Sequence, residues 1–237
     1  MKAIMYVAHG SRLPEKNREF RHFVDQIMQS RPESCQQIAF LEKEDETMAI
    51  VGESIIAAGA KEITVVPMLL FPAMHATKDI PDQVAQLKKL HPDVVFRIAD
   101  TFGAEQEVAA VAAAKIKATR PDQDAAILVI VHGSASYAEP RTQMQTVTAS
   151  IATQLQLPVA LGMLHGDPNY RAIATELAAK HENVHWMPYF LFQGQLVDKI
   201  RAGISEISGT QWHEADSLDL DTAMITAVLR KITEVTP

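Results

Sequence analysis

Two histidines and one glutamate stand where the sequence predicts the carboxyl ends of β-strands. His9 and Glu42 each end a short apolar run, and His75 lies seven residues beyond the end of a third run. Because the carboxyl ends of neighbouring parallel strands meet at one sheet edge, we expect these side chains to converge. Neutral imidazole binds cobalt, iron, nickel or zinc, and it also accepts protons near neutral pH. A carboxylate beside it could orient a ring, complete a metal shell or accept a proton.

The residues around this expected site offer both acids and cations. Asp45 and Glu46 follow Glu42 closely, so the sequence leaves open which acid faces inward. Gly10 permits a tight turn directly after His9. We expect donors and positive charge at the same mouth to contact an anionic substrate, helped by backbone N–H groups at helix N-termini. The residues concerned are Ser11, Arg12, Thr77 and Lys78.

The elements that must position this site alternate between strand and helix. Short apolar runs predict buried strands, and segments with apolar residues at helical spacing follow each of them. This alternation is typical of βα units that build a parallel sheet. The predicted strands cover residues 3–8, 38–41, 63–68 and 94–98, and the predicted helices cover 15–30, 47–58, 81–90 and 105–119.

The pattern then repeats after a polar segment at 119–124. Strand and His-Gly-Ser motifs, a Pro-x-x-x-Phe motif and an Ala-Asp pair recur in order, at offsets of 123, 121 and 116 residues. Three ordered matches at nearly one offset indicate a duplication. We therefore predict two similar α/β domains, at residues 1–120 and 125–237. Each would be a mainly four-stranded parallel sheet flanked by helices, with a cleft between the two domains.

The second half departs from the first at one position. His132 repeats His9, and we expect it to contact the substrate. Leu196, however, stands where the first half has His75, so the predicted site is single and belongs to residues 1–120, and the second copy is degenerate. His165 lies in a loop at the same edge and is a secondary candidate. Any one of these histidines taken alone would more often be a hydrogen-bonded structural residue than a ligand.

Composition excludes several functional classes. The chain has 237 residues, of which 47% are hydrophobic, and its net charge of −7 argues against a general nucleic-acid binder. One cysteine, Cys35, excludes an internal disulfide and a Cys-rich metal site. No apolar run approaches the roughly 20 residues of a membrane span. The opening residues read as a first strand rather than a signal peptide, which predicts a cytoplasmic protein.

Three stretches carry a resemblance to a known family. They are Val7-Ala8-His9-Gly10-Ser11-Arg12, Ala39-Phe40-Leu41-Glu42, and the segment from Val66 through His75 to Pro81, with the pattern PxxxxPxxHxxxDIP. At these residues the sequence resembles the sirohydrochlorin chelatases, the ATP-independent class II tetrapyrrole chelatases of cobalamin and sirohaem synthesis. The likeness recurs weakly through the second half, as in the long two-domain members.

The resemblance implies a chelatase-like, flavodoxin-like fold and the insertion of Co²⁺ or Fe²⁺, with Ni²⁺ as a third candidate, into the octacarboxylic macrocycle sirohydrochlorin. In that family the histidines matching His9 and His75 bind the incoming metal. We hypothesise that these two present the ion and that one accepts a pyrrole proton, with Glu42 assisting. No further cofactor is expected, because the metal is itself a substrate and no P-loop pattern occurs in the sequence.

Other functions compete with this one. A non-catalytic metal or tetrapyrrole carrier could use the same cleft. A hydrolase would need a GxSxG elbow, which the sequence lacks. Because a chain with two halves can close its own cleft, we expect a monomer.

Overall fold

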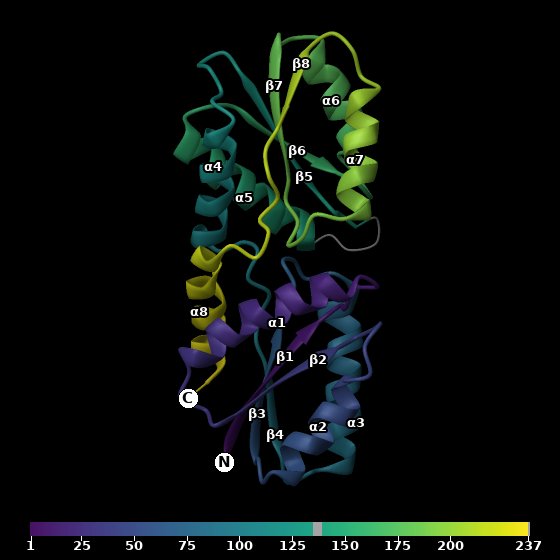
Figure 1. Cartoon of the computed structure of the whole chain (residues 1–237), viewed down its shortest axis with the longest axis vertical. Helices are drawn as coiled ribbons and strands as arrows, with labels where there is room; N and C mark the ends of the chain where they lie inside the picture. Colours follow the sequence, from purple (N-terminus) through teal and green to yellow (C-terminus); the bar gives the residue numbers. More distant parts are fainter. Residues whose placement is uncertain (135–138, 237) are drawn as a thin grey trace. The chain divides into compact units, whose positions relative to one another are not determined.

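A computed structural model describes residues 1–134 and 139–236. The chain divides into two compact units. The first comprises Met1–Phe102 together with Ile225–Pro237, and the second comprises Gly103–Met224. Each unit is a parallel sheet with helices on both faces (Figure 1).

The first unit is built on a four-stranded sheet in the order β2-β1-β3-β4. All three strand pairings are parallel, so all four strands end at the same edge. The strands are β1 (Lys2–Ala8), β2 (Cys35–Phe40), β3 (Glu62–Pro67) and β4 (Val95–Ile98), and the helices are α1 (Pro14–Gln29), α2 (Met48–Ala57), α3 (Ile80–Leu90) and α8 (Ile225–Val235).

Burial explains why the central strand β1 is apolar on both faces. Met5 and Val7 belong to a core cluster that includes Ile55 of α2 and Val84 of α3. Ile4 and Tyr6 point the other way, because side chains alternate along a strand, and both are fully buried. Figure 1 shows α1 and α8 over that second face, and α8 contacts both α1 and β3. A strand covered on both sides reads as a continuous hydrophobic run.

The second unit repeats this architecture. Its sheet has the order β6-β5-β7-β8, again with every pairing parallel. Its strands are β5 (Ala126–Val131), β6 (Val159–Met163), β7 (Asn183–Pro188) and β8 (Gln211–Glu214), and its helices are α4 (Gln106–Ala118), α5 (Glu139–Leu155), α6 (Tyr170–Ala178) and α7 (Gln195–Ser205).

The duplication extends to the hydrogen-bond register. In the first sheet Val7 pairs with Ala39 and Pro67. In the second, Ile130 pairs with Gly162 and Pro188. The predicted fold class, two α/β domains with four-stranded parallel sheets flanked by helices, is therefore confirmed.

The compact units do not follow the ranges 1–120 and 125–237 expected from the repeat. Helix α4 follows β4 in sequence but packs against α5 and β7 of the second sheet. Helix α8 follows β8 in sequence but packs against α1 and β3 of the first. The two sheets present equivalent apolar faces, so the final helix of each repeat has two possible partners, and the repeat pattern does not distinguish them.

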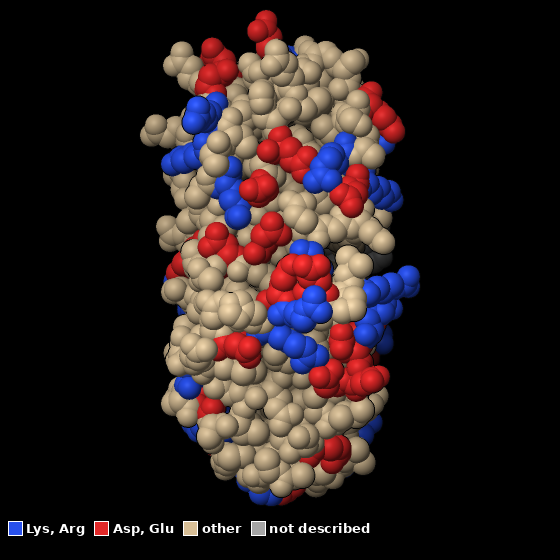
Figure 2. Space-filling view, in the orientation of Figure 1, with Lys and Arg blue, Asp and Glu red and all other residues tan. Residues whose placement is uncertain are grey.

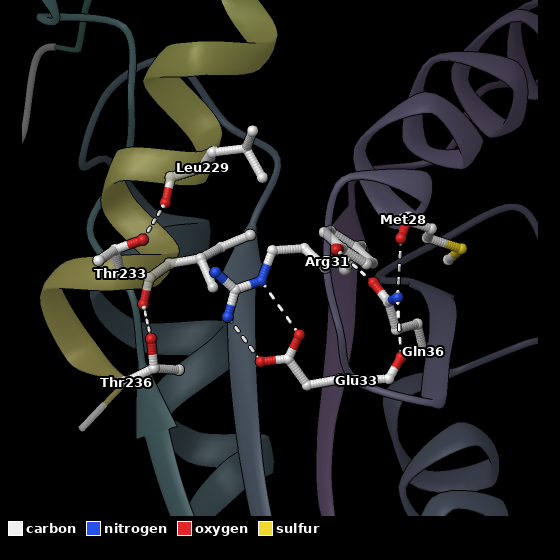
Figure 3. A network of polar contacts seen from close by, with 9 residues as sticks. Met28, Arg31, Glu33, Gln36, Leu229, Thr233 and Thr236 are labelled. Carbon is white, nitrogen blue, oxygen red and sulfur yellow. Dashed lines mark hydrogen bonds and ion pairs between the residues drawn. The ribbon is translucent and has the colours of Figure 1, made fainter.

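A polar network closes the first unit at the junction between α1 and β2 (Figure 3). Arg31 donates from Nε and Nη2 to the two carboxylate oxygens of Glu33, at 3.1 and 2.6 Å. Gln36 donates to the carbonyl oxygens of Met28 and Glu33, and its own amide oxygen accepts from Tyr6. Figure 3 shows the Arg31 side chain extending toward α8, so this network supports the region where α1 and α8 meet.

On the face drawn in Figure 2, Lys and Arg side chains are interspersed with Asp and Glu. Within residues 1–134 and 139–236, none of the helices combines the length and apolar character needed to cross a bilayer.

Candidate metal centre

His9 is held at the carboxyl edge of the first sheet by the backbone. The chain beyond β2 continues alongside the chain beyond β1, with the Leu41 and Glu42 N–H groups donating to the Ala8 and His9 carbonyls, both at 2.9 Å. Gly10 turns the chain away at φ +91°, and a Cβ there would overlap the Glu42 carbonyl oxygen. Glycine is therefore required for the two strand ends to approach this closely.

His75 lies in a helical turn rather than in the expected loop. Residues His75–Asp79 form a π-helical turn that leads directly into α3. Single π-turns occur frequently at functional sites. The turn brings Asp79 to the Nδ1 edge of the ring, with 2.7 Å between His75 Nδ1 and Asp79 Oδ2. Because a carboxylate can only accept, Nδ1 carries the proton and Nε2 presents a lone pair.

The structure brings the two candidate imidazoles together. The ring centroids of His9 and His75 lie 4.7 Å apart, with the planes at 73°. With metal–nitrogen bonds of about 2.1 Å, two rings bound to one ion at roughly 90–110° have centroids about 4.5–5.2 Å apart. The separation thus suits two ligands of one ion. The His75 side chain is 27% exposed and His9 is exposed, so both rings are open to solvent.

Glu42 lies beside this pair but does not complete a shell. Its carboxylate is bound by Lys43 at 2.5 Å. The hydrogen bond and charge of Lys43, with smaller contributions from His9 and His75, lower the pKa of Glu42 below its ordinary value. Glu42 is therefore an anion at neutral pH. In the described part of the chain, no three His, Cys, Asp or Glu side chains converge closely enough to hold an ion.

A pocket of about 310 Å³ opens beside His75. It is formed by the segment after β2 and by the π-turn with the first turns of α3. Its lining residues are Leu41, Glu42, His75, Asp79, Asp82 and Gln83. Four of these six side chains carry a carboxylate or an imidazole, which gives the pocket the polar lining that a hydrated cation requires.

The structure also distinguishes between the acids that follow β2. Glu46 Oε1 is bound by Arg21 at 2.9 Å, and the Glu46 backbone carbonyl accepts from Phe40. Asp45 is exposed and does not line the pocket. Glu42 is thus the acid of this loop that lies at the pocket.

Of the five predicted substrate contacts, the four in the first unit follow the ends of β1 and β3, and three of these four already have hydrogen-bond or ion-pair partners. Ser11 Oγ accepts from the Leu13 N–H, and Thr77 Oγ1 donates to the Ala73 carbonyl. Lys78 pairs with Asp82 at 2.9 Å, and both side chains are well exposed. Arg12 is exposed in the turn after His9.

Sequence reasoning missed Asp79 as a functional residue. The sequence contains a signal for this pairing, because His75 and Asp79 stand four residues apart, the spacing at which side chains meet on a helix. Placing His75 in a loop concealed that pairing. The orientation of the His75 ring depends on it.

The second sheet carries a related histidine pair at its own edge. The His132 and His165 ring centroids lie 5.1 Å apart, with the planes at 59°. Both residues are exposed. The pKa of His165 lies below its ordinary value. Partial desolvation is the largest cause, and the charges of His132 and Lys199 are smaller ones. His165, a secondary candidate in the sequence, is thus the neighbour of His132.

The family is decided by a match along nearly the whole chain. The CbiX family model matches residues 3–119 and 126–235, one range for each repeat. This chain belongs to the CbiX family.

Curated relatives of this CbiX-family chain carry two names. It is 26% identical over 212 residues to a sirohydrochlorin ferrochelatase of Priestia megaterium, covering 88% of this chain and 80% of the relative. It is 28% identical over 213 residues to the sirohydrochlorin ferrochelatase of Bacillus subtilis, covering 87% and 80%. It is 26% identical over 234 residues to a sirohydrochlorin cobaltochelatase of Priestia megaterium, covering 87% and 69%.

Solved structures show that the CbiX-family fold is shared along the whole chain. SirB from Bacillus subtilis with Fe³⁺ matches with a TM-score of 0.90 at 24% identity, covering 98% of this chain and 94% of that one. The sirohydrochlorin chelatase SirB of Bacillus subtilis subspecies spizizenii, in complex with cobalt, matches with a TM-score of 0.85 at 23% identity and the same coverage.

Proposed function

We propose that this chain is a sirohydrochlorin chelatase that inserts Co²⁺ or Fe²⁺ into the tetrapyrrole without ATP. One observation carries the proposal: in a CbiX-family chain, the ring centroids of His9 and His75 lie 4.7 Å apart at an exposed sheet edge. The names of the curated relatives support the substrate and both metals. The metal is a substrate in this reaction, so no resident cofactor is invoked, and the chain acts as a cytoplasmic monomer.

The two imidazoles hold the incoming ion with positions left open. A structural site with four protein ligands would retain a metal too tightly for transfer. Two neutral nitrogen ligands leave the remaining positions to water, which the macrocycle nitrogens replace one at a time. The carboxylate of Asp79 keeps His75 in the tautomer with Nε2 unprotonated, so the ring can bind metal without first losing a proton.

Insertion releases two protons from the macrocycle for each divalent ion gained. The imidazoles are the best placed acceptors, because each regains a free nitrogen as the metal leaves it. Glu42 is a weaker base, since its lowered pKa means that its carboxylate holds a proton less readily. We assign it an electrostatic role, in which its negative charge stabilises the cation and the imidazolium formed after transfer.

The macrocycle carries carboxylates, and cations at the same edge offer them partners. Arg12 is exposed in the turn after His9, and Lys78 lies in the π-turn that leads into α3. We assign these residues, with Ser11 and Thr77, to substrate binding, and His132 of the second sheet to the same role. Lys78 must exchange its Asp82 partner for a substrate carboxylate.

The test is the change in the absorbance spectrum of sirohydrochlorin when Co²⁺ or Fe²⁺ is added anaerobically. The full chain should accelerate metal insertion well beyond the uncatalysed rate with at least one of the two metals. Tight binding of sirohydrochlorin with no acceleration by either metal would contradict the proposal and identify a carrier instead. Running Ni²⁺ in parallel measures how far two imidazoles discriminate among ions of similar coordination preference.

A further inference from the structure

His132 and His165 form a histidine pair that the proposed reaction centre does not use for metal. His132 directly follows β5, the central strand of the second sheet, and His165 follows β6. Both belong to the compact unit Gly103–Met224, whereas His9 and His75 belong to the other unit. Substrate binding, the role assigned to His132 above, does not account for its pairing with His165.

The backbone beneath the second pair repeats that of the first centre. The Leu164 and His165 N–H groups donate to the Val131 and His132 carbonyls at 2.9 Å. These bonds match the ones that join Leu41 and Glu42 to Ala8 and His9. His165 consequently occupies the place in the second sheet that Glu42 has in the first.

Glycine again permits the close approach. Gly133 has φ +72°, and a Cβ on it would overlap the His165 carbonyl oxygen. The close contact holds the two strand ends together and so keeps the two rings adjacent. Their juxtaposition follows from the fold rather than from chance contacts between long side chains.

The separation and orientation suit two ligands of one ion. The centroid distance of 5.1 Å falls within the range of about 4.5–5.2 Å expected for two imidazoles on one metal. His132 Nδ1 lies 3.0 Å from the Gly133 carbonyl, which can only accept, so Nδ1 carries the proton and Nε2 has the lone pair. A backbone carbonyl is a common orienting partner for a metal-binding histidine.

A purely structural role does not account for these rings. Both residues are exposed, so neither fills the core of the second unit. Among the described residues, the His165 ring has no hydrogen-bond partner. Two exposed imidazoles at ligand spacing have the geometry of a cation site.

We propose that His132 and His165 bind one divalent first-row transition-metal ion, such as Co²⁺, more weakly than His9 and His75 do. The weaker binding follows from charge. The first centre has the carboxylates of Glu42 and Asp79 beside its rings. The second has a backbone carbonyl as orienting partner, and Lys199 is near enough to disfavour positive charge at His165. Leu196, which cannot bind a metal, stands at the position that matches His75 of the first unit.

The experiment is an anaerobic titration of the full chain with Co²⁺ alone, without tetrapyrrole, followed by calorimetry and equilibrium dialysis. The wild-type chain should bind two ions, the second at least about tenfold more weakly. His75→Leu should remove the tighter event and leave the weaker one. The double variant His75→Leu/His165→Leu should lose the weaker event as well, because one imidazole is insufficient to hold the ion. The control is His75→Leu/His22→Ala, which changes an exposed histidine on α1 and should keep the weaker event.

Two results would overturn the proposal. One is that the His75→Leu chain binds no Co²⁺. The other is that its remaining binding survives His165→Leu, which would place the ion elsewhere. Failure of the proposed function gives a different pattern: the His165-dependent event persists, while the tighter event is missing or is insensitive to His75→Leu. Thermal unfolding of each variant establishes that the fold is intact.

Discussion

The edges of the two sheets have the same backbone arrangement and the same first histidine, and they differ at two matched side chains. The first edge carries His9, Glu42 and His75. The second carries His132, His165 and Leu196 at the matching positions. Strand order, register and the glycine turn are the same in both. The duplicated fold therefore fixes where these side chains lie. The two residues that differ decide whether an edge has a carboxylate and a helix-borne imidazole near the metal.

The largest expected effect comes from replacing His75 of the first edge by leucine, the residue at the matching position of the second edge. His75→Leu removes one of two metal ligands, and we expect the rate of insertion to fall by more than about a hundredfold, beyond the loss typical of an outer-sphere partner. Stability should change by less than about 0.5 kcal/mol, since the side chain is partly exposed. Insertion rates and thermal unfolding of the same preparation measure both.

The matched control is Leu196→Ala at the second edge, where Leu196 is 39% exposed. It should leave the insertion rate unchanged. If His75→Leu lowers stability and activity in proportion, His75 is a structural residue and the comparison fails.

Asp79 tests whether orientation of the imidazole matters. Asp79→Asn keeps the size of the side chain but weakens its hold on the Nδ1 proton, so insertion should fall about 10- to 100-fold. Asp82→Asn, on the next turn and paired with Lys78, is the control and should have a much smaller effect on metal affinity. Co²⁺ affinity, measured separately from the sirohydrochlorin KM, distinguishes the two. Equal losses in both variants would indicate a general effect of negative charge.

The two turn glycines should be equivalent in stability and unequal in function. In Gly10→Ala and Gly133→Ala the new alanine must adopt a left-handed conformation, and its Cβ overlaps a carbonyl oxygen. Each substitution should therefore lower the free energy of unfolding by at least about 1–3 kcal/mol. Gly10→Ala should also reduce insertion about tenfold, because it displaces Glu42 and His9. Denaturant unfolding with initial rates at a permissive temperature gives both values. Gly133→Ala should act only through the substrate contact of His132, so an equal fall in kcat in both variants would contradict a single reaction centre.

The smallest effect concerns the response of the two sheets to acid. His185 of β7 is 2% exposed and stacks on His213 of β8, with centroids 4.4 Å apart. Burial, and then His213, lower the pKa of His185 below 6.5. The first sheet has Thr64 and Arg97 at this pairing.

A base whose pKa is lower in the folded state stabilises the fold fully above its ordinary pKa and loses that contribution as pH falls below it. We therefore expect the protection factors of the β7 amides, which correct for the intrinsic pH dependence of exchange, to fall more than those of β3 between pH 7.5 and pH 5.5. His185→Thr, which introduces the residue found at the matching position of β3, should reduce the difference. An equal fall in both strands, unaffected by the substitution, would remove His185 as the cause.

Much of the architecture follows from local patterns in the sequence. The apolar runs ending before His9 and His132 identify the central strands, since a strand buried on both faces must be hydrophobic throughout. The ordered repeats then imply two sheets with one topology. The ends of β1 and β2 place His9 and Glu42 at a shared edge, because parallel strands end on the same side.

Only the tertiary structure decided three further features. The π-turn that pairs His75 with Asp79 depends on how α3 docks, and periodicity does not encode it. The placement of α4 and α8 depends on which of two similar apolar faces each helix covers, a choice made by packing between distant segments. The contact of His132 with His165 likewise arises from strand pairing across residues far apart in the chain. Local sequence specifies which elements form, whereas side-chain contacts depend on the energy of packing those elements together.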